Sequence, residues 1–343
     1  MSFKCIRKLP SAEELYQKYP FKEDLAEVKK ARDIEIKNIF TGLDNRLLLV
    51  IGPCSAHHED AVSEYIKRLA RLQEKVKDKI VIIPRIYTNK PRTNGLGYKG
   101  MLHQPDFKKD SDMLSGLEAI RRMHIRVFDE SRLAAADEML YPENYPYLSD
   151  LLSYVAIGAR SVENQQHRLT ASGFDIPVGM KNPTSGDLEV MFDSILASQS
   201  SHMLVYTGWE AQTDGNDLTH AVLRGAVDKD GKFQPNYHYE SLIKAADIYR
   251  KRELNNPAII VDTNHANSGK LFYEQPRIAK EIMNSRRHSD SLKGVIKGLM
   301  IESYLLEGAQ SPNGNEFGKS ITDPCLGWDA SERLVYDLAD MTY

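Results

Sequence analysis

Cysteine is scarce in this sequence, with only Cys5, Cys54 and Cys325 among 343 residues. An odd and sparse set of this kind argues against a disulfide framework and is typical of a reducing compartment. The amino-terminal segment also lacks the apolar core and small-residue cleavage site of a secretory signal. We therefore expect a cytoplasmic protein, in which a cysteine within a motif is first a candidate ligand or reactive thiol.

Long apolar runs and an excess of positive charge are absent as well. No stretch approaches the roughly 20 apolar residues that a membrane-spanning helix needs, so we expect no membrane association. The formal net charge is -3 and lysine and arginine form no dense cluster, which argues against a nucleic-acid partner. The hydrophobic content of 41% instead suits one large domain with a substantial core.

Short apolar runs alternate with amphipathic segments from about residue 46 onward. Continuous apolar runs of this length are typical of strands buried on both faces in a parallel sheet. We predict strands at residues 47–51, 80–84, 133–136, 154–159, 176–180, 202–206, 258–261 and 295–301. We predict helices at residues 59–74, 113–123, 145–154, 163–171, 188–198, 239–251 and 275–285.

This alternation predicts a (β/α)8 TIM barrel over residues 46–343, preceded by a polar, partly helical N-terminal extension over residues 1–45. An open, doubly wound sheet would give the same alternation, so the pattern favours the barrel only modestly. In a barrel, the residues that follow each strand meet at one mouth, where active sites lie.

Cationic side chains follow several of the predicted strands. This cationic set comprises Arg85, Lys90, Arg92, Arg160, Lys181 and Arg224. Six positive charges at one mouth would repel one another unless a polyanion filled it, and the planar fork of arginine suits both phosphate and carboxylate. The set therefore predicts a site for phosphorylated substrates. Arg224 fits least simply, because the sixth run ends in YTGW and Arg224 comes only after a further loop.

A second set of side chains is suited to a metal ion. It comprises Cys54, His265, Glu302 and Asp323. A thiolate, an imidazole and two carboxylates can bind Mn2+, Fe2+, Co2+ or Zn2+, although no CxxC or HxxxH spacing supports the site locally. A metal beside a phosphate-rich pocket is consistent with attack of a carbon nucleophile on a polarised carbonyl, and equally with metal-assisted hydrolysis of a phosphorylated substrate.

The motifs IGPCS, KPRT, AIGAR, MKN, NHANS, IES and GKSITDPCLGW together resemble those of type I 3-deoxy-D-arabino-heptulosonate 7-phosphate (DAHP) synthases, from about residue 20 to about residue 339. The resemblance implies a TIM-barrel enzyme that condenses phosphoenolpyruvate with erythrose 4-phosphate, the first step of the shikimate pathway to aromatic amino acids. It also implies a homodimer or homotetramer, with the N-terminal extension serving the oligomer or its regulation.

The resemblance further implies roles for individual residues. The four residues of the second set would bind the metal, and Lys90 and Glu138 would act in catalysis with Cys54 and His265. Implied substrate-binding residues are Arg85, Lys90, Arg92, Thr93, Lys99, Gly158, Ala159, Arg160, Lys181 and Arg224. Arg85 and Lys90 would hold the phosphoenolpyruvate carboxylate, and Arg160, Lys181 and Arg224 its phosphate. Arg92 and Thr93 would hold the phosphate of erythrose 4-phosphate.

Some features depart from the family pattern, and two other functions stay open. The loop at residues 208–216 is short, and Asp175 and Tyr206 place charged or bulky groups where regulated members bind a feedback amino acid, so we expect weak or absent inhibition by phenylalanine. A 3-deoxy-octulosonate 8-phosphate synthase-like enzyme is one alternative, against which the KPRT motif argues. A non-catalytic barrel is the other, against which the complete ligand and cation sets argue.

Overall fold

Eight parallel strands form the centre of this computed structural model, which describes residues 2–92, 95–106 and 108–342. The barrel strands are β1 (Leu47–Gly52), β2 (Ile80–Pro84), β3 (Ala135–Glu138), β4 (Leu152–Ile157), β5 (Val178–Lys181), β8 (Thr219–Leu223), β11 (Ile259–Asp262) and β12 (Ile296–Glu302). Each strand pairs with its neighbours in chain order, and β12 returns to pair with β1. A parallel bridge between Arg85 and Ala136 joins β2 to β3, which closes the barrel and confirms the predicted fold.

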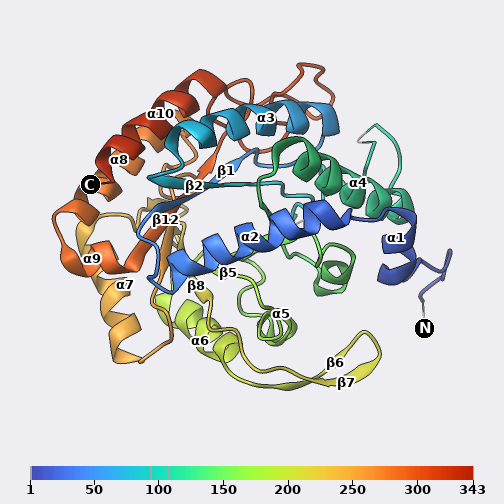
Figure 1. Ribbon diagram of the computed structural model, residues 1–343, viewed down its shortest axis with the longest axis horizontal. Helices are drawn as coiled ribbons and strands as arrows, with labels where there is room; N and C mark the ends of the chain where they lie inside the picture. Colours follow the sequence, from blue (N-terminus) through green and yellow to red (C-terminus); the bar gives the residue numbers. More distant parts are fainter. Residues whose placement is uncertain (1, 93–94, 107, 343) are drawn as a thin grey trace.

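Helices surround the barrel on its outside (Figure 1). They are α3 (Glu59–Val76), α4 (Met113–Ser131), α5 (Gln165–Ala171), α6 (Leu188–Gln199), α7 (Tyr239–Lys251), α8 (Gln275–Arg287), α9 (Asp290–Val295) and α10 (Trp328–Met341), with short 3-10 helices η1 (Pro142–Tyr147) and η2 (Phe272–Glu274). In α3, the apolar positions Ala61, Tyr65, Leu69 and Leu72 recur near the helical period and are buried against the strands. The core between strands and helices therefore follows from the sequence pattern.

The sixth barrel strand is not the predicted one. The run at residues 202–206 forms β6 (Met203–Tyr206), which pairs with β7 (Trp209–Gln212) in an antiparallel ribbon outside the barrel. The sixth strand of the barrel is β8. Its polar residues Thr219 and His220 interrupt the apolar run that would have indicated a buried strand. The His220 imidazole is nevertheless fully buried, because its Nε2 lies 2.8 Å from Oη of Tyr154 and its Nδ1 lies 2.9 Å from the carbonyl oxygen of Leu218.

The helix predicted at residues 145–154 is also wrong. The chain forms only η1 there and then enters β4 at Leu152. Pro142 and Pro146 lie within this turn, and proline supplies no backbone donor to continue a helix. The buried run that follows is needed as a barrel strand, so the connection between β3 and β4 stays short.

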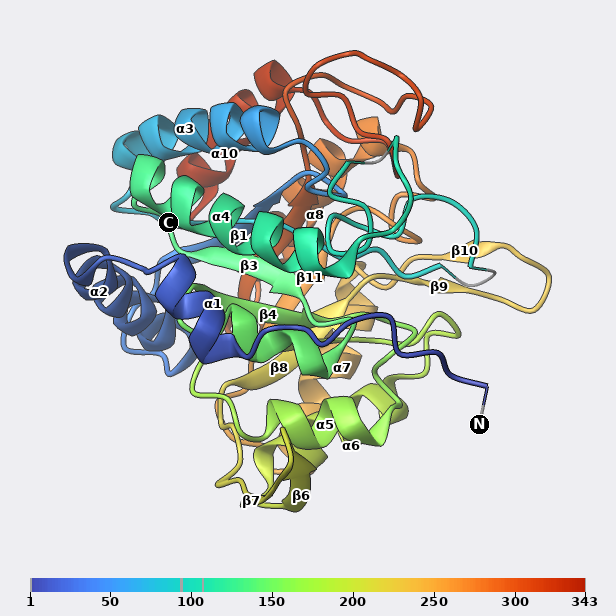
Figure 2. The same ribbon diagram turned by 90° about the vertical axis from the view of Figure 1, so that its right-hand side faces the viewer.

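The N-terminal extension contains α1 (Ala12–Lys18) and α2 (Glu23–Phe40), and α2 closes the amino end of the barrel. Ile36, Ile39 and Phe40 of α2 are buried in the same apolar cluster as side chains from the barrel interior. The ring of Phe40 lies 4.4 Å, between centroids, from that of His220. Figure 2 shows α2 on one side of the barrel and the short strands β9 (Ala226–Val227) and β10 (Phe233–Gln234) on the other.

Within the described residues, every helix is too short or too polar to cross a lipid bilayer.

Candidate active site

A cavity of about 240 Å³ opens at the carboxyl ends of the barrel strands, on the side opposite α2. All six members of the cationic set line it, together with Glu138 and the backbone at Gly158 and Ala159. These residues lie at or after the ends of strands β2, β3, β4, β5 and β8, so strand ends that are far apart in the sequence together form the wall of the cavity. Arg224 comes directly after β8, so it follows a barrel strand as the other members of the cationic set do.

Several cations of the cavity have no negative partner. Arg92, Arg160 and Arg224 form no ion pair with a carboxylate among the described residues, and Nη1 of Arg224 is buried without a hydrogen-bond partner there. Burial lowers the pKa of the Arg224 guanidinium, although the nearby Asp262 opposes this effect. A buried guanidinium without a partner is costly, so the cavity is suited to an anionic ligand.

Glycine at position 158 allows Glu138, one of the acidic residues that line the cavity, to approach the backbone after β4. A methyl group at Gly158 would overlap Oε1 of Glu138, the only carboxylate group near that position among the described atoms. Glu138 is the last residue of β3 and Gly158 follows β4, so the glycine leaves room for the carboxylate where these two strand ends lie side by side. Glu138 is thereby held among the cations of the cavity.

Arg85 and Glu302 form a buried ion pair at the base of the cavity. Nη2 of Arg85 lies 2.8 Å from Oε1 of Glu302, and both side chains are at most 2% exposed. The Arg85 guanidinium also donates to the carbonyl oxygen of Pro53 and stacks 3.8 Å above the ring of Tyr87. Burial raises the pKa of Glu302, but Arg85, His265 and Lys90 outweigh this effect and hold it below its usual value.

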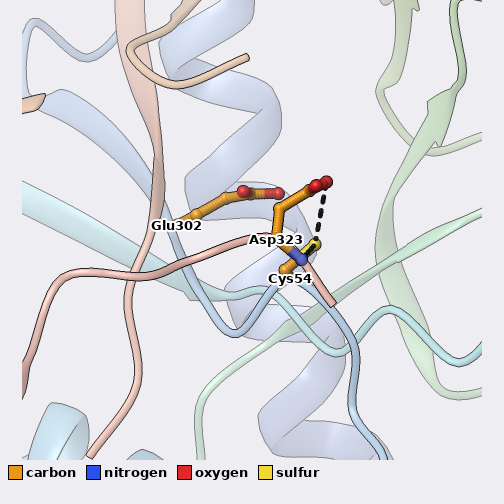
Figure 3. Close-up of side chains that lie close together, drawn as sticks. All are labelled: Cys54, Glu302 and Asp323. Atoms are coloured by element: carbon orange, nitrogen blue, oxygen red, sulfur yellow. Dashed lines mark hydrogen bonds between the residues drawn. The ribbon is translucent and has the colours of Figure 1, made fainter. Parts of the chain in front are cut away.

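Cys54, Glu302 and Asp323 bring three possible metal-binding atoms within 4.8 Å of one another (Figure 3). The backbone N–H of Asp323 donates to Sγ of Cys54 at 3.4 Å, and Nζ of Lys90 lies 2.6 Å from the same sulfur. Burial, followed by the charge of Glu302, raises the pKa of the Cys54 thiol to about 12. The cluster therefore combines two carboxylates with a thiol that a cation would be needed to deprotonate.

His265 lies at the edge of this cluster. Its Nε2 is 3.8 Å from Oε1 of Glu302, and it stands outside the group of three whose atoms lie within 4.8 Å. Its backbone is left-handed, with a φ of 51°, which a residue other than glycine rarely adopts. Oε1 of Glu302 is the oxygen that pairs with Arg85, and it accepts no well-aligned hydrogen bond within the described residues. The thiol, the imidazole and the two carboxylates are a donor set that fits a divalent cation.

The sequence analysis gave no role to two residues of this region. Asp262 ends β11, is fully buried, and has Oδ2 within 2.9 Å of Nδ1 of His265. A carboxylate partner for a metal-binding histidine is a general expectation that could have found it. Lys270 lines the cavity with its Nζ 4.0 Å from Oδ1 of Asp323, and no motif indicated it.

Two residues implied by the resemblance have a different status. Lys99 does not line the cavity, although its carbonyl oxygen accepts a hydrogen bond from the backbone N–H of Lys90 at 3.1 Å. Thr93 lies outside the described residues. The substrate roles of both stay predictions.

The chain is similar to characterised proteins over almost its whole length. The profile of the DAHP synthetase I family matches residues 24–335. A phospho-2-dehydro-3-deoxyheptonate aldolase from Haemophilus influenzae is 39% identical over 337 residues, covering 95% of this chain and 89% of that protein. The Phe-sensitive phospho-2-dehydro-3-deoxyheptonate aldolase of Escherichia coli K12 is 38% identical over 349 residues, covering 99% and 96%.

A solved structure agrees with these sequence relationships. The structure of phospho-2-dehydro-3-deoxyheptonate aldolase from Francisella tularensis SCHU S4 superposes with a TM-score of 0.92 at 31% identity, covering 99% of this chain and 98% of that one. The barrel, the arrangement of its mouth and the extent of these matches lead to one conclusion: the chain belongs to the DAHP synthetase I family.

Proposed function

We propose that this chain is a 3-deoxy-7-phosphoheptulonate synthase, a transferase that condenses phosphoenolpyruvate with erythrose 4-phosphate to give DAHP and inorganic phosphate at the start of aromatic amino-acid biosynthesis. One observation carries the proposal above all others. A buried thiol and two carboxylates lie beside a cavity lined by the cationic set and Lys270, and Arg92, Arg160 and Arg224 form no ion pair with a carboxylate among the described residues. Family membership and the names of the relatives support the same reaction.

The cations of the cavity would bind the two substrates. Arg160, Lys181 and Arg224 hold the phosphate of phosphoenolpyruvate. Arg85 and Lys90 hold its carboxylate, and Arg92 with Thr93 holds the phosphate of erythrose 4-phosphate. Charge-assisted hydrogen bonds to arginine give this binding both strength and orientation. The bound substrates are thus aligned with C3 of phosphoenolpyruvate facing the aldehyde carbon.

The reaction joins those two carbon atoms. C3 of phosphoenolpyruvate attacks the aldehyde, and Lys90 protonates the alkoxide that results. Glu138 orients the water that adds at C2, after which the C–O bond to the phosphate breaks and inorganic phosphate leaves. The cationic walls stabilise the charge that develops on the phosphate and on the new hydroxyl.

Cys54, His265, Glu302 and Asp323 would hold a divalent cation beside the aldehyde. A bound Mn2+, Fe2+, Co2+ or Zn2+ ion supplies Lewis-acid polarisation of a carbonyl. Asp323 and Glu302 contribute negative charge, and the Cys54 sulfur contributes a soft donor. The choice between these metals follows from availability as well as from this mixed donor set.

The protein would work in the cytoplasm as a homodimer or homotetramer. Apolar side chains on the β6–β7 ribbon are exposed, with Val205 81% and Trp209 75% exposed. A two-stranded ribbon is marginally stable alone, and apolar groups exposed on it are suited to burial against a second copy of the chain. The division at residues 45 and 46, with the extension serving the oligomer, stays a prediction. Light scattering on the purified protein tests the oligomeric state.

The activity is tested by phosphate release from phosphoenolpyruvate with erythrose 4-phosphate or arabinose 5-phosphate, in EDTA and after addition of Mn2+. We expect turnover with the four-carbon sugar only, lost in EDTA and restored by metal. Preference for the five-carbon sugar would instead indicate a 3-deoxy-octulosonate 8-phosphate synthase-like enzyme. No turnover with either sugar at full metal loading would indicate a non-catalytic barrel.

A further inference from the structure

One buried carboxylate oxygen, Oδ2 of Asp262, lies close both to a cation of the cavity and to a candidate metal ligand. Oδ2 of Asp262 lies 3.0 Å from Nζ of Lys181 and 2.9 Å from Nδ1 of His265. Oδ1 of the same carboxylate accepts the backbone N–H of Asn264 at 3.0 Å, which fixes its orientation. Lys181 belongs to the cationic set and His265 is one of the four candidate metal ligands, so Asp262 contacts a member of each group.

The surroundings leave these three groups few other partners. Asp262 is fully buried and does not line the cavity, so it cannot touch a substrate there. Within the described residues, Asp262 is the only acidic partner of Lys181, whose side chain is 5% exposed. The Nδ1 atom of His265 faces Asp262 while its Nε2 faces Glu302. Asp262 is therefore a positioning residue and acts through its two neighbours.

We propose that Asp262 couples the binding of the phosphate-bearing substrate to the binding of the metal ion. The proposal rests on the proposed function in taking phosphoenolpyruvate as the anion and a divalent cation as the metal. The Asp262 carboxylate, 2.9 Å from Nδ1 of His265, favours a proton on that nitrogen, which leaves the Nε2 lone pair on the side of Glu302. Oδ2 of Asp262 also pairs with Lys181, and this second interaction weakens the interaction between Asp262 and His265 when no substrate is present.

A phosphate bound to Lys181 changes this sharing. The ammonium then donates to the phosphate, and Oδ2 of Asp262 interacts more strongly with His265. The imidazole becomes a stronger donor to the metal, because a carboxylate partner increases the electron density on the far nitrogen. Phosphoenolpyruvate therefore tightens metal binding, and by linkage the metal tightens binding of phosphoenolpyruvate by the same factor.

Equilibrium binding of Mn2+, followed by the electron paramagnetic resonance signal of the free ion, measures this coupling without turnover. In the wild-type protein, we expect saturating phosphoenolpyruvate to lower the Kd for Mn2+ by about fivefold or more, a typical coupling between two sites. In Asp262→Asn, which keeps the volume and loses the charge, we expect Mn2+ to bind about 10- to 100-fold more weakly. Phosphoenolpyruvate should then change that Kd by less than about twofold.

A matched pair of variants separates the shared oxygen from general charge effects. Lys181→Gln and Arg224→Gln each remove one buried cation of the cavity, but only the first frees Oδ2 of Asp262. We expect Lys181→Gln, measured without phosphoenolpyruvate, to bind Mn2+ more tightly than Arg224→Gln does. This comparison keeps the proposal testable if Asp262→Asn does not fold.

Three results would overturn the proposal: wild-type Mn2+ affinity in Asp262→Asn, unchanged coupling in that variant, or equal Mn2+ affinity in Lys181→Gln and Arg224→Gln. Failure of the proposed function gives a different pattern. In that case the wild-type protein would not turn over phosphoenolpyruvate with either sugar, whatever the Mn2+ binding of the variants.

Discussion

The ammonium of Lys90 lies 2.6 Å from the thiol sulfur of Cys54. This contact is where the cationic wall meets the candidate metal-binding group, because Nζ of Lys90 is also 3.3 Å from Oδ2 of Asp323. The residue that we propose as proton donor and one of the candidate metal-binding atoms are thus in direct contact at the wall of the cavity.

The metal-binding group leads to the first prediction. Cys54→Ala or His265→Ala should lose at least about 100-fold in turnover, because a metal site with three protein ligands holds its ion more weakly and in altered geometry. Added Mn2+ should not restore activity. Phosphate release and metal content measured together test this, with the exposed Cys5→Ala as the control that keeps both. Full activity of either variant would remove that residue from the ligand set.

Two members of the cationic set, Arg224 and Arg92, should differ in the substrate that they bind. Arg224→Gln should raise KM for phosphoenolpyruvate by roughly 10- to 100-fold, the usual worth of a hydrogen bond to a charged group, with a smaller change for erythrose 4-phosphate. Arg92→Gln should show the reverse pattern. Steady-state kinetics with each substrate varied in turn measures both. Equal changes for the two substrates in both variants would contradict the assigned positions.

The approach of Glu138 to Gly158 gives a third prediction. In Gly158→Ala the added methyl group should displace the flexible Glu138 side chain rather than the backbone, because the overlap is with its terminal oxygen. Turnover should fall by about 10-fold or more while the unfolding free energy changes by less than about 1 kcal/mol. Gly294→Ala, where open space surrounds the new methyl group, is the control and should keep full activity. A variant that keeps wild-type turnover would show that Glu138 has no catalytic part.

Stability should fall in mild acid because of His220. Burial lowers the pKa of its imidazole to about 4, below the ordinary value of 6.5, so the unfolded chain binds a proton that the folded chain excludes. The stability that this neutral imidazole contributes is complete above pH 6.5 and is lost as the pH falls towards 4. Between pH 7 and pH 5 the loss should be about 2 kcal/mol.

Denaturant unfolding of His220→Gln measures this effect. The variant cannot take up the proton, so its stability should fall less steeply between pH 7 and pH 5 than that of the wild type. His288→Gln is the matched control, because His288 is exposed and directly follows the last residue of α8. Parallel pH profiles for the wild type and both variants would show that His220 does not titrate as described.

Phenylalanine should inhibit the enzyme weakly or not at all. Tyr206 lines a cavity between the β6–β7 ribbon and α5, where the rings of Tyr145 and Phe174 stack with centroids 3.7 Å apart. The prediction rests on Asp175 and Tyr206, which place a charged and a bulky group in the region where regulated members of the family bind a feedback amino acid. A titration of activity with phenylalanine tests the prediction, and half-inhibition at cellular concentrations would contradict it.

Most of what the sequence could predict depends on one relationship: residues that follow the strands of a barrel meet at one mouth. Cys54, Arg85 and Glu302 each follow an apolar run. They are far apart in the sequence, and the barrel brings them into contact. The sixth strand could not be recognised, because His220 is polar and its hydrogen bond to Tyr154 exists only in the folded chain. Asp262 was at a predicted strand end, yet its sharing between two partners depends on side-chain distances that no sequence pattern contains.

The position of Phe40 has a consequence for how this chain can be divided. A fragment starting at residue 46 would lose the residues that separate the barrel interior from bulk solvent, although it would keep every residue proposed to touch substrate. Water would reach apolar groups that are dry in the whole chain, and the fragment would be prone to aggregate. We therefore predict that the barrel is not stable without the extension, so fusions should be placed before α1 and the chain should not be cut between α2 and β1.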